Sequence, residues 1–182
     1  MKKAILGAAL LFSPLLAMAG NWPVTVKDMD NRTVTVTQEP QRIILQDGRD
    51  ILTLAVLERD NPFAKVVAWN NLPKKQDTET WNVLKRKWPE ADKILDMKFS
   101  DQGNVDLETV ISRHPDLMIA QLRAKPSLVQ SGVLAKLDAL HVPVVFVDYE
   151  LHPVENTMPS IAMLGKVLGQ SERAQAYINF YQ

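Results

Sequence analysis

The sequence VDLETVISRHPDLMIA, residues 105–120, joins a short amphipathic segment directly to an uninterrupted apolar one. Leu107, Val110 and Ile111 recur at the spacing that places side chains on one face of a helix. Glu108 stands near the start of this segment, where a carboxylate interacts favourably with the helix dipole. The pattern therefore predicts a short helix with one buried face.

A proline ends this helix, and a buried strand follows. The residue before a proline is pushed out of the α-helical region, so the helix should end by His114, which precedes Pro115. Residues 117–120, LMIA, have the uniformly apolar character of a parallel strand that is covered on both faces. The stretch as a whole indicates one helix-to-strand step of an α/β fold.

The rest of the sequence repeats this alternation. Residues 24–26 and 33–36 alternate with a period of two around the turn-favouring pair Asp30-Asn31, which predicts an N-terminal β-hairpin. We expect further strands at residues 42–45, 66–69, 93–96 and 142–147, helices at 50–58, 78–88, 127–140, 153–168 and 171–181, and a loop at 70–76. Strands alternating with helices through short connections predict an α/β fold, with a mostly parallel central sheet flanked by helices.

Composition limits the class of protein. The 182 residues suit a single domain, and a hydrophobic content of 46% is enough to build its core. The 21 basic and 21 acidic side chains balance, whereas a nucleic-acid partner normally requires a basic excess. The sequence contains no cysteine, so disulfides make no contribution to its stability.

The N-terminus has the pattern of a secretory signal peptide. Two lysines precede the apolar residues 4–16, and residues 17–19, AMA, form an A-x-A cleavage site. The apolar run is shorter than the roughly 18 residues that a transmembrane helix needs. We therefore expect residues 1–19 to be removed and the mature chain to reside in the periplasm. Without a cysteine after the cleavage site, no lipid anchor is expected there.

The sequence offers little for catalysis or for direct metal binding. Two of its three histidines, His114 and His152, directly precede prolines, and His141 lies in a helix-to-strand turn. Sites for bare zinc or manganese need a cluster of histidines and carboxylates. No phosphate-binding glycine loop and no nucleophile elbow occurs. We expect no enzymatic activity, no metal site and no intrinsic cofactor.

Five stretches, in order, resemble one protein family. Residues 105–120 are similar to the helix–"kPDLVI"–strand signature of periplasmic binding proteins that serve ABC importers of iron-siderophores, haem and cobalamin. The other four resemble that family's N-terminal hairpin and first strand, its second strand, a later helix-to-strand step, and the helices that lead into its long connecting helix. They are VTVKDMDNRTVTV with EPQRIILQ, AKVVAWNN, LAKLDALHVPVVFVD, and SIAMLGKVLGQSERAQAYINFY.

The resemblance implies one lobe of a two-lobe receptor. Such proteins join two α/β lobes through a long helix and bind their ligand between the lobes. We expect residues 20–168 to form the N-terminal lobe and residues 169–182 to begin the connecting helix, with the C-terminal lobe absent from this sequence. An apolar stripe on the last helix would then have little to cover it, namely Ala174, Tyr177, Ile178 and Tyr181.

The resemblance also implies ligand contacts at the carboxyl ends of the strands, which is where open parallel sheets bind ligands. Arginine presents a rigid fork of donors to carboxylate or catecholate oxygens, and indole rings supply flat contact area. A plainer role is open for two candidates: Arg49 pairs with Asp47 or Asp50, and Trp69 plugs the end of the sheet. The candidate ligand contacts are Gln46, Arg49, Trp69, Asn70, Asn71, Gln102, Gln121 and Arg123.

Glu108 has a separate implied role. In the resembling proteins an exposed glutamate of this short helix docks against arginines of the membrane permease, and Glu108 occupies that position. Its plainer role is that of a first-turn carboxylate stabilised by the helix dipole, worth roughly a few tenths of a kcal/mol. The two roles are compatible.

We therefore expect a monomeric receptor lobe that binds a ferric siderophore or a related iron chelate and delivers it to an ABC permease in the inner membrane. Haem and cobalamin are competing ligands. Haem ranks lower because related haem receptors often use an axial tyrosine, which the first four loops lack. For cobalamin, Gln121 stands where an aromatic side chain would help. An interaction or sensory module without transport is the alternative from another class.

Overall fold

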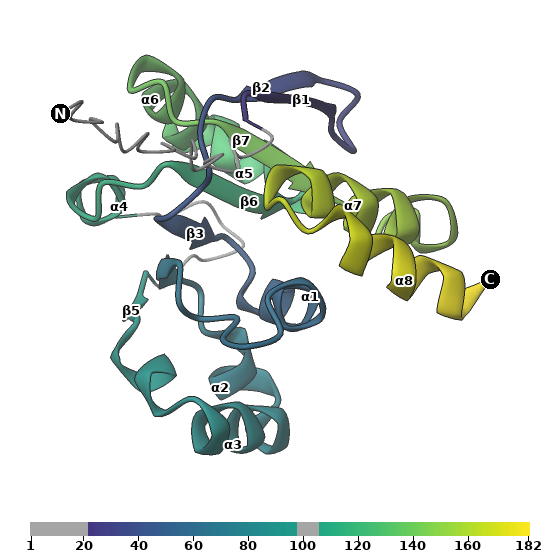
Figure 1. Cartoon of the computed structure of the whole chain (residues 1–182). Coiled ribbons are helices and arrows are strands. Elements are labelled where there is room, and N and C mark those ends of the chain that lie inside the picture. The colour runs from purple at the N-terminus through teal and green to yellow at the C-terminus, as the bar shows by residue number, and fades with distance from the viewer. Residues whose placement is uncertain (1–21, 98–105) are drawn as a thin grey trace, which may run out of the picture.

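The computed structural model describes residues 22–97 and 106–182 and contains a five-stranded sheet flanked by helices (Figure 1). Every strand pairing of this sheet is parallel in the described residues. The strands lie in the order β5 (Leu95–Asp96), β4 (Val66–Trp69), β3 (Ile43–Leu45), β6 (Leu117–Gln121) and β7 (Val144–Val147). The chain adds β4 and β5 on one side of β3 and then β6 and β7 on the other. The winding direction therefore reverses between β3 and β6.

Side chains along β3, β6 and β7 alternate between two apolar cores, one on each face of the sheet. On β3, Ile43 and Leu45 join one core while Ile44 joins the other. The first core is covered by α1 (Ile51–Leu57), α7 (Pro153–Val167) and α8 (Ser171–Tyr181). The second core is covered by α4 (Leu107–Ser112), α5 (Lys125–Gln130) and α6 (Val133–Ala139). The predicted parallel sheet flanked by helices is confirmed.

The predicted N-terminal hairpin is also confirmed, as the antiparallel pair β1 (Val24–Lys27) and β2 (Thr33–Val36). A buried carboxylate fixes it to the sheet. Asp28 accepts hydrogen bonds from the Arg32 backbone N–H (3.0 Å), the Arg32 guanidinium (2.6 Å) and the Phe146 backbone N–H of β7 (3.2 Å). The Arg32 guanidinium also lies over the Phe146 ring, 4.6 Å from its centroid.

Two local predictions are wrong. Residues 127–140 form α5 and α6 instead of one helix, because Gly132 adopts a positive φ of 75° between them. The polar residues 70–76, predicted as a loop, contain α2 (Leu72–Gln76). The Asn71 side chain caps this helix by accepting from the Lys74 N–H, and Pro73 stands in its first turn. Beyond it lie α3 (Thr78–Lys87) and the 3-10 helix Pro89–Lys93.

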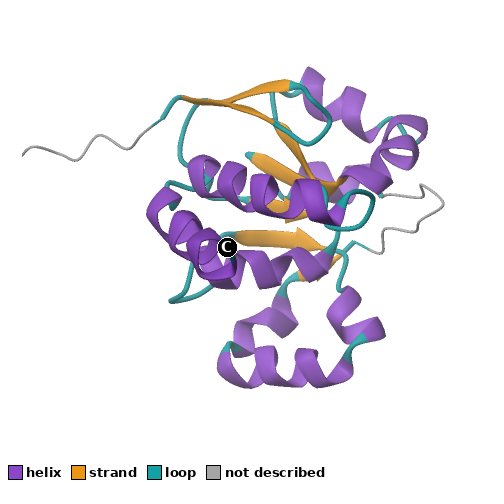
Figure 2. Cartoon of the chain, turned by 90° about the vertical axis from the view of Figure 1, so that its right-hand side faces the viewer, coloured by secondary structure: helices purple, strands orange, loops and turns teal. Residues whose placement is uncertain are grey.

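The apolar stripe on the last helix, which we expected to be exposed, is largely covered. Ala174 and Ile178 are only 1% and 7% exposed, because α1 and α7 of the same lobe pack against α8. The Arg173 guanidinium adds a hydrogen bond of 2.8 Å to the Leu57 carbonyl of α1. Tyr177 is partly buried and Tyr181 is exposed. Figure 2 shows α7 and α8 side by side across this face.

None of the helices in residues 22–97 and 106–182 has the length and apolar character needed to cross a membrane.

Close contact between α7 and α8 depends on Gly165. A Cβ atom at this position would lie 2.5 Å from the Ala174 Cβ and 3.3 Å from the Gln170 carbonyl oxygen. We predict that Gly165→Ala lowers the free energy of unfolding by about 1–3 kcal/mol, measured by urea denaturation. Because Ala174→Gly removes the methyl group in the way, the double variant should lose less than the sum of the two single changes. Additive losses would contradict this packing account.

Candidate functional site

The reversal between β3 and β6 brings the loops that follow these two strands together. Leu45 pairs with Ile119, and the Gln46 backbone N–H donates to the Ile119 carbonyl at 2.9 Å. The Gln46 side-chain oxygen in turn accepts from the backbone N–H of Gln121 at 3.1 Å. Both loops therefore leave the sheet from one point on its carboxyl edge. In open α/β sheets this reversal point is where ligands bind.

A buried carboxylate, that of Asp47, organises the loop after β3. Its side chain is 1% exposed and accepts from the Arg49 backbone N–H at 2.9 Å, the Arg49 guanidinium at 2.6 Å and the Arg123 guanidinium at 2.8 Å. Burial alone would raise the pKa of Asp47, but the hydrogen bonds and charge of Arg49, with Arg123, lower the pKa overall. The carboxylate therefore holds both predicted arginines side by side.

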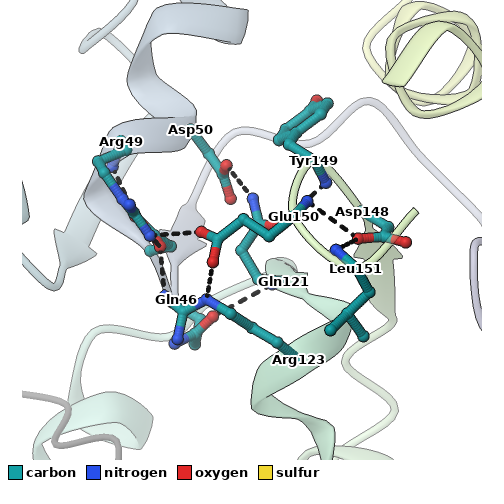
Figure 3. A network of polar contacts seen from close by, with 10 residues as sticks. Gln46, Arg49, Asp50, Gln121, Arg123, Asp148, Tyr149, Glu150 and Leu151 are labelled. Atoms are coloured by element: carbon teal, nitrogen blue, oxygen red, sulfur yellow. Dashed lines mark hydrogen bonds and ion pairs between the residues drawn. The ribbon is translucent and has the colours of Figure 1, made fainter. Parts of the chain in front are cut away.

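A second carboxylate, that of Glu150, closes the cluster from the loop after β7 (Figure 3). One of its oxygens lies 2.6 Å from Nη2 of Arg49, and the other lies 2.9 Å from Nε of Arg123. Two acids and two arginines thus form a closed ring of ion pairs with no net charge. Hydrogen bonding to Asp47 raises the pKa of Arg49.

The turn that carries Glu150 is built by Asp148. The Asp148 carboxylate accepts from the backbone N–H groups of Glu150 (3.1 Å), Leu151 (2.8 Å) and His152 (3.1 Å), and from the Asn156 amide (2.8 Å). Burial alone would raise the pKa of Asp148, but these hydrogen bonds lower it overall. Asp148 therefore fixes the backbone from which the Glu150 side chain extends.

A further carboxyl group, that of Asp50, lies in the protein interior next to the ring. It is buried, and one oxygen accepts from the Gln121 amide, whereas the other has no hydrogen-bond partner among the described residues. Burial, together with the nearby charge of Asp47, raises the pKa of Asp50 well above its usual value. Burial likewise raises the pKa of Tyr149, whose hydroxyl lies 3.2 Å from the Thr53 hydroxyl.

The loop after β4 approaches the site through its backbone. The Gly48 N–H donates to the Asn70 carbonyl at 2.9 Å, and a Cβ at Gly48 would lie 2.2 Å from that oxygen, so only glycine fits here. The predicted contacts Asn70 and Asn71 are buried. The Asn70 side chain accepts from Lys75 at 2.9 Å, and Asn71 caps α2.

The remaining predicted residues are Trp69, Gln102 and Glu108. Trp69 is 0% exposed and packs against Phe63 and Trp81, with ring centroids 5.5 and 5.9 Å away, so it fills the core at the sheet end instead of facing the polar cluster. Gln102 lies outside the described residues. Glu108 is exposed in the first turn of α4.

The structure therefore brings together Gln46, Arg49, Gln121 and Arg123. Sequence reasoning missed Glu150 and the buried partnership of Asp50 with Gln121. The signal for Glu150 was its place just after the β7 strand, which is where the other candidates stand on their own strands. Chemically, two guanidinium groups held by the same carboxylates suit an anion that offers two oxygen atoms.

Asp50 generates a prediction about pH. In the unfolded chain this carboxyl ionises near a pKa of about 3.9, while the folded state keeps its proton to higher pH. Above about pH 4 the unfolded state therefore binds fewer protons, and the free energy of unfolding falls as pH rises. Asp50→Asn cannot titrate. We predict that its free energy of unfolding, relative to the unsubstituted chain, increases between about pH 4 and pH 7, by up to about 1 kcal/mol per pH unit.

Urea denaturation of both proteins across this range measures the difference. A constant offset from the new amide is compatible with the prediction, because only the change with pH matters. A pH-independent difference would show that Asp50 is ionised in the folded protein.

Several solved structures share this fold. The chain is 24% identical to the TroA-like periplasmic binding protein FepB from Veillonella parvula, with a TM-score of 0.78, over 87% of this chain and 46% of that one. It is 16% identical to the molybdate-bound binding protein MolA of Haemophilus influenzae, with a TM-score of 0.65, over 84% and 48%. It is 22% identical to the catecholate-siderophore-binding protein VctP from Vibrio cholerae, with a TM-score of 0.53, over 86% and 49%.

At these identities the likeness shows the fold, and the chain spans about half the length of the relatives that it matches. None of the curated proteins matches the sequence. The family model described as "Periplasmic binding protein" matches residues 47–182, which begin at the buried carboxylate of the ring and run to the end of the sequence. By this match the chain belongs to the periplasmic binding protein family.

Proposed function

We propose that the chain is the N-terminal lobe of a solute receptor for an ABC importer and that it binds an anionic ferric chelate in the periplasm. The ligand contacts are the guanidinium groups of Arg49 and Arg123, supported by the amides of Gln46 and Gln121. Residues 1–19 direct export, and α8 begins the helix that leads to a second lobe.

One observation carries this proposal, namely that two arginines lie side by side at the reversal point of a parallel sheet. Both are held by one buried carboxylate, at 2.6 Å from Arg49 and 2.8 Å from Arg123. Their positions are therefore set before any ligand arrives. Preorganised charged donors reduce the ordering cost of binding, which favours a ligand with negatively charged oxygens.

Relatives of the same fold support this ligand class. VctP is described as a catecholate-siderophore-binding protein, YclQ from Bacillus subtilis as a petrobactin-binding protein, and MolA as a molybdate-binding protein. Catecholate and molybdate share negatively charged oxygens, the groups that paired arginines bind best. Haem is bound by another relative of this fold, so haem belongs among the ligands to be tested.

Delivery to a permease is assigned to Glu108. This side chain is exposed in the first turn of α4, which begins after the capping residue Asp106. Asp106 accepts from the Thr109 N–H at 3.1 Å and satisfies the helix end, so Glu108 is not needed as a cap. An exposed carboxylate that the fold does not need as a cap is suited to docking against a basic surface.

The ligand assignment predicts the effect of two substitutions. In Arg49→Gln and Arg123→Gln, glutamine keeps an amide donor near Asp47 but removes the positive charge. Each change should weaken binding of ferric citrate and of a ferric tris-catecholate about tenfold or more, because a charge-assisted hydrogen bond is lost. Equilibrium dialysis with radioactive iron, at about 1 mM protein, detects even millimolar dissociation constants for a single lobe.

Arg59→Gln is the matched control, since Arg59 is exposed beyond the opposite end of α1. Molybdate, haem, cobalamin and a neutral ferric trihydroxamate complete the ligand set, each quantified in the dialysis through its own metal. If the unsubstituted chain retains none of the anionic iron chelates, the assignment of ligand class is wrong. Retention of only haem or only cobalamin would replace it with that ligand.

The docking assignment predicts that Glu108→Lys reduces chelate uptake by at least about fivefold in cells that depend on this protein, because like charges then oppose each other at the interface. Affinity for the chelate should stay unchanged. Glu79→Lys is a close control: Glu79 is also exposed in the first turn of a helix, after the capping residue Asp77. Both changes disturb the helix dipole equally, so equal uptake in the two variants would remove the docking role.

A further inference from the structure

Glu150 occupies the position on the two arginines that an anionic ligand would need. Its carboxylate spans the pair, with one oxygen 2.6 Å from Arg49 Nη2 and the other 2.9 Å from Arg123 Nε (Figure 3). A carboxylate or catecholate of a chelate presents the same feature, two negatively charged oxygens a short distance apart. Glu150 therefore has the chemistry of the proposed ligand.

The two acids of the ring differ in how easily they can leave it. The Asp47 side chain is 1% exposed and binds the arginines from the protein interior. It also caps the 3-10 helix of its own loop, Gly48–Asp50. The Glu150 side chain is 38% exposed, and it binds them from the side open to solvent. Water can replace the arginines around Glu150, whereas moving Asp47 would leave a buried charge unpaired. Glu150 is thus the exchangeable acid.

The backbone under Glu150 need not move when its side chain leaves. Asp148 holds the N–H groups of Glu150, Leu151 and His152, at 2.8 to 3.1 Å, independently of the arginines. The Glu150 side chain can rotate outward on this fixed turn. Replacing Glu150 by a ligand therefore requires only a change in the rotamer of the Glu150 side chain.

We propose that Glu150 is an internal competitor that covers Arg49 and Arg123 until an anionic ligand displaces it; this inference rests on the proposed function above. With Glu150 in place the ring is neutral. With Glu150 displaced, two arginines and Asp47 carry one net positive charge. The site consequently selects ligands that offer a pair of anionic oxygens, and it rejects neutral chelates, which cannot replace the carboxylate.

Removing the competitor should tighten binding. In Glu150→Gln the side chain keeps its size but loses its charge, so the two partly exposed ion pairs no longer have to be exchanged. We expect ferric citrate and a ferric tris-catecholate to bind on the order of tenfold more tightly, and a neutral ferric trihydroxamate to change less than about twofold. Glu155→Gln is the matched control: Glu155 is exposed in the first turn of α7, and the same charge is removed there.

A second measurement needs no ligand. Phenylglyoxal modifies accessible guanidinium groups, and mass spectrometry reports the rate at each arginine. Arg49 and Arg123 should react several times faster in Glu150→Gln than in the unsubstituted chain or in Glu155→Gln. The rates at Arg59 and Arg173 should stay equal in all three proteins and serve as internal references.

The outcomes separate the two proposals. Faster modification of the two arginines together with tighter binding of the anionic chelates supports the competitor. Unchanged modification, or an affinity for ferric citrate that stays equal or falls in Glu150→Gln, overturns it while the proposed function stands. If the unsubstituted chain and Glu150→Gln both retain no anionic chelate, the proposed function fails and the competitor fails with it.

Discussion

The parallel pairing of β3 with β6 determines where every polar group of the site lies. These strands are far apart in the sequence, yet their register sets Leu45 opposite Ile119, so the loops that follow begin at the same height. The exchange of hydrogen bonds between Gln46 and the β6 strand then fixes the two loops against each other. Because the winding reverses here, α1 and α5, which follow the two strands, cover opposite faces of the sheet. The Arg49 and Glu150 side chains at this point stay partly exposed. The apolar cores on the two faces of the sheet stabilise the strands from which these loops extend.

The electrostatics of the site follow from one buried charge. Asp47 is ionised although it is buried, because two arginines compensate it. A second ionised carboxylate three residues later would lie in the same buried region with little compensation, so the pKa of Asp50 is raised well above its usual value. Asp50 accepts a hydrogen bond from the Gln121 amide and orients it. Opposite pKa shifts in neighbouring acids thus separate a group that holds the arginines from a group that supports the loop behind them.

Local patterns predicted the sheet, the hairpin and the order of elements, because strand burial and turn formation depend on residues close together in the sequence. They also placed Gln46, Arg49, Gln121 and Arg123 at strand ends, from which the parallel fold brings them together. Where long-range packing decides, the predictions failed: Gly132 splits a helix that periodicity joined, and α1 and α7 cover Ala174 and Ile178. Trp69 fills the core because Phe63 and Trp81 surround it, which the sequence near Trp69 does not reveal. Glu150 was missed for the same reason, since its partners are more than 25 residues away.

We propose above that two arginines bind an anion, and such arginines must be ordered and yet available to the ligand. Asp47 meets the first need, because it holds both guanidinium groups within the fold and removes much of the entropy cost of positioning them. Alone, however, it would leave a net positive charge facing solvent, where any small anion could settle. Glu150 neutralises that charge with a group tethered to the same chain, at a high effective concentration. A monovalent anion with a single point of contact cannot easily replace both of its oxygens, whereas a chelate with paired oxygens can. In the proposed receptor, the ring of four charges accounts for order, protection and selectivity through the different burial of its two acids.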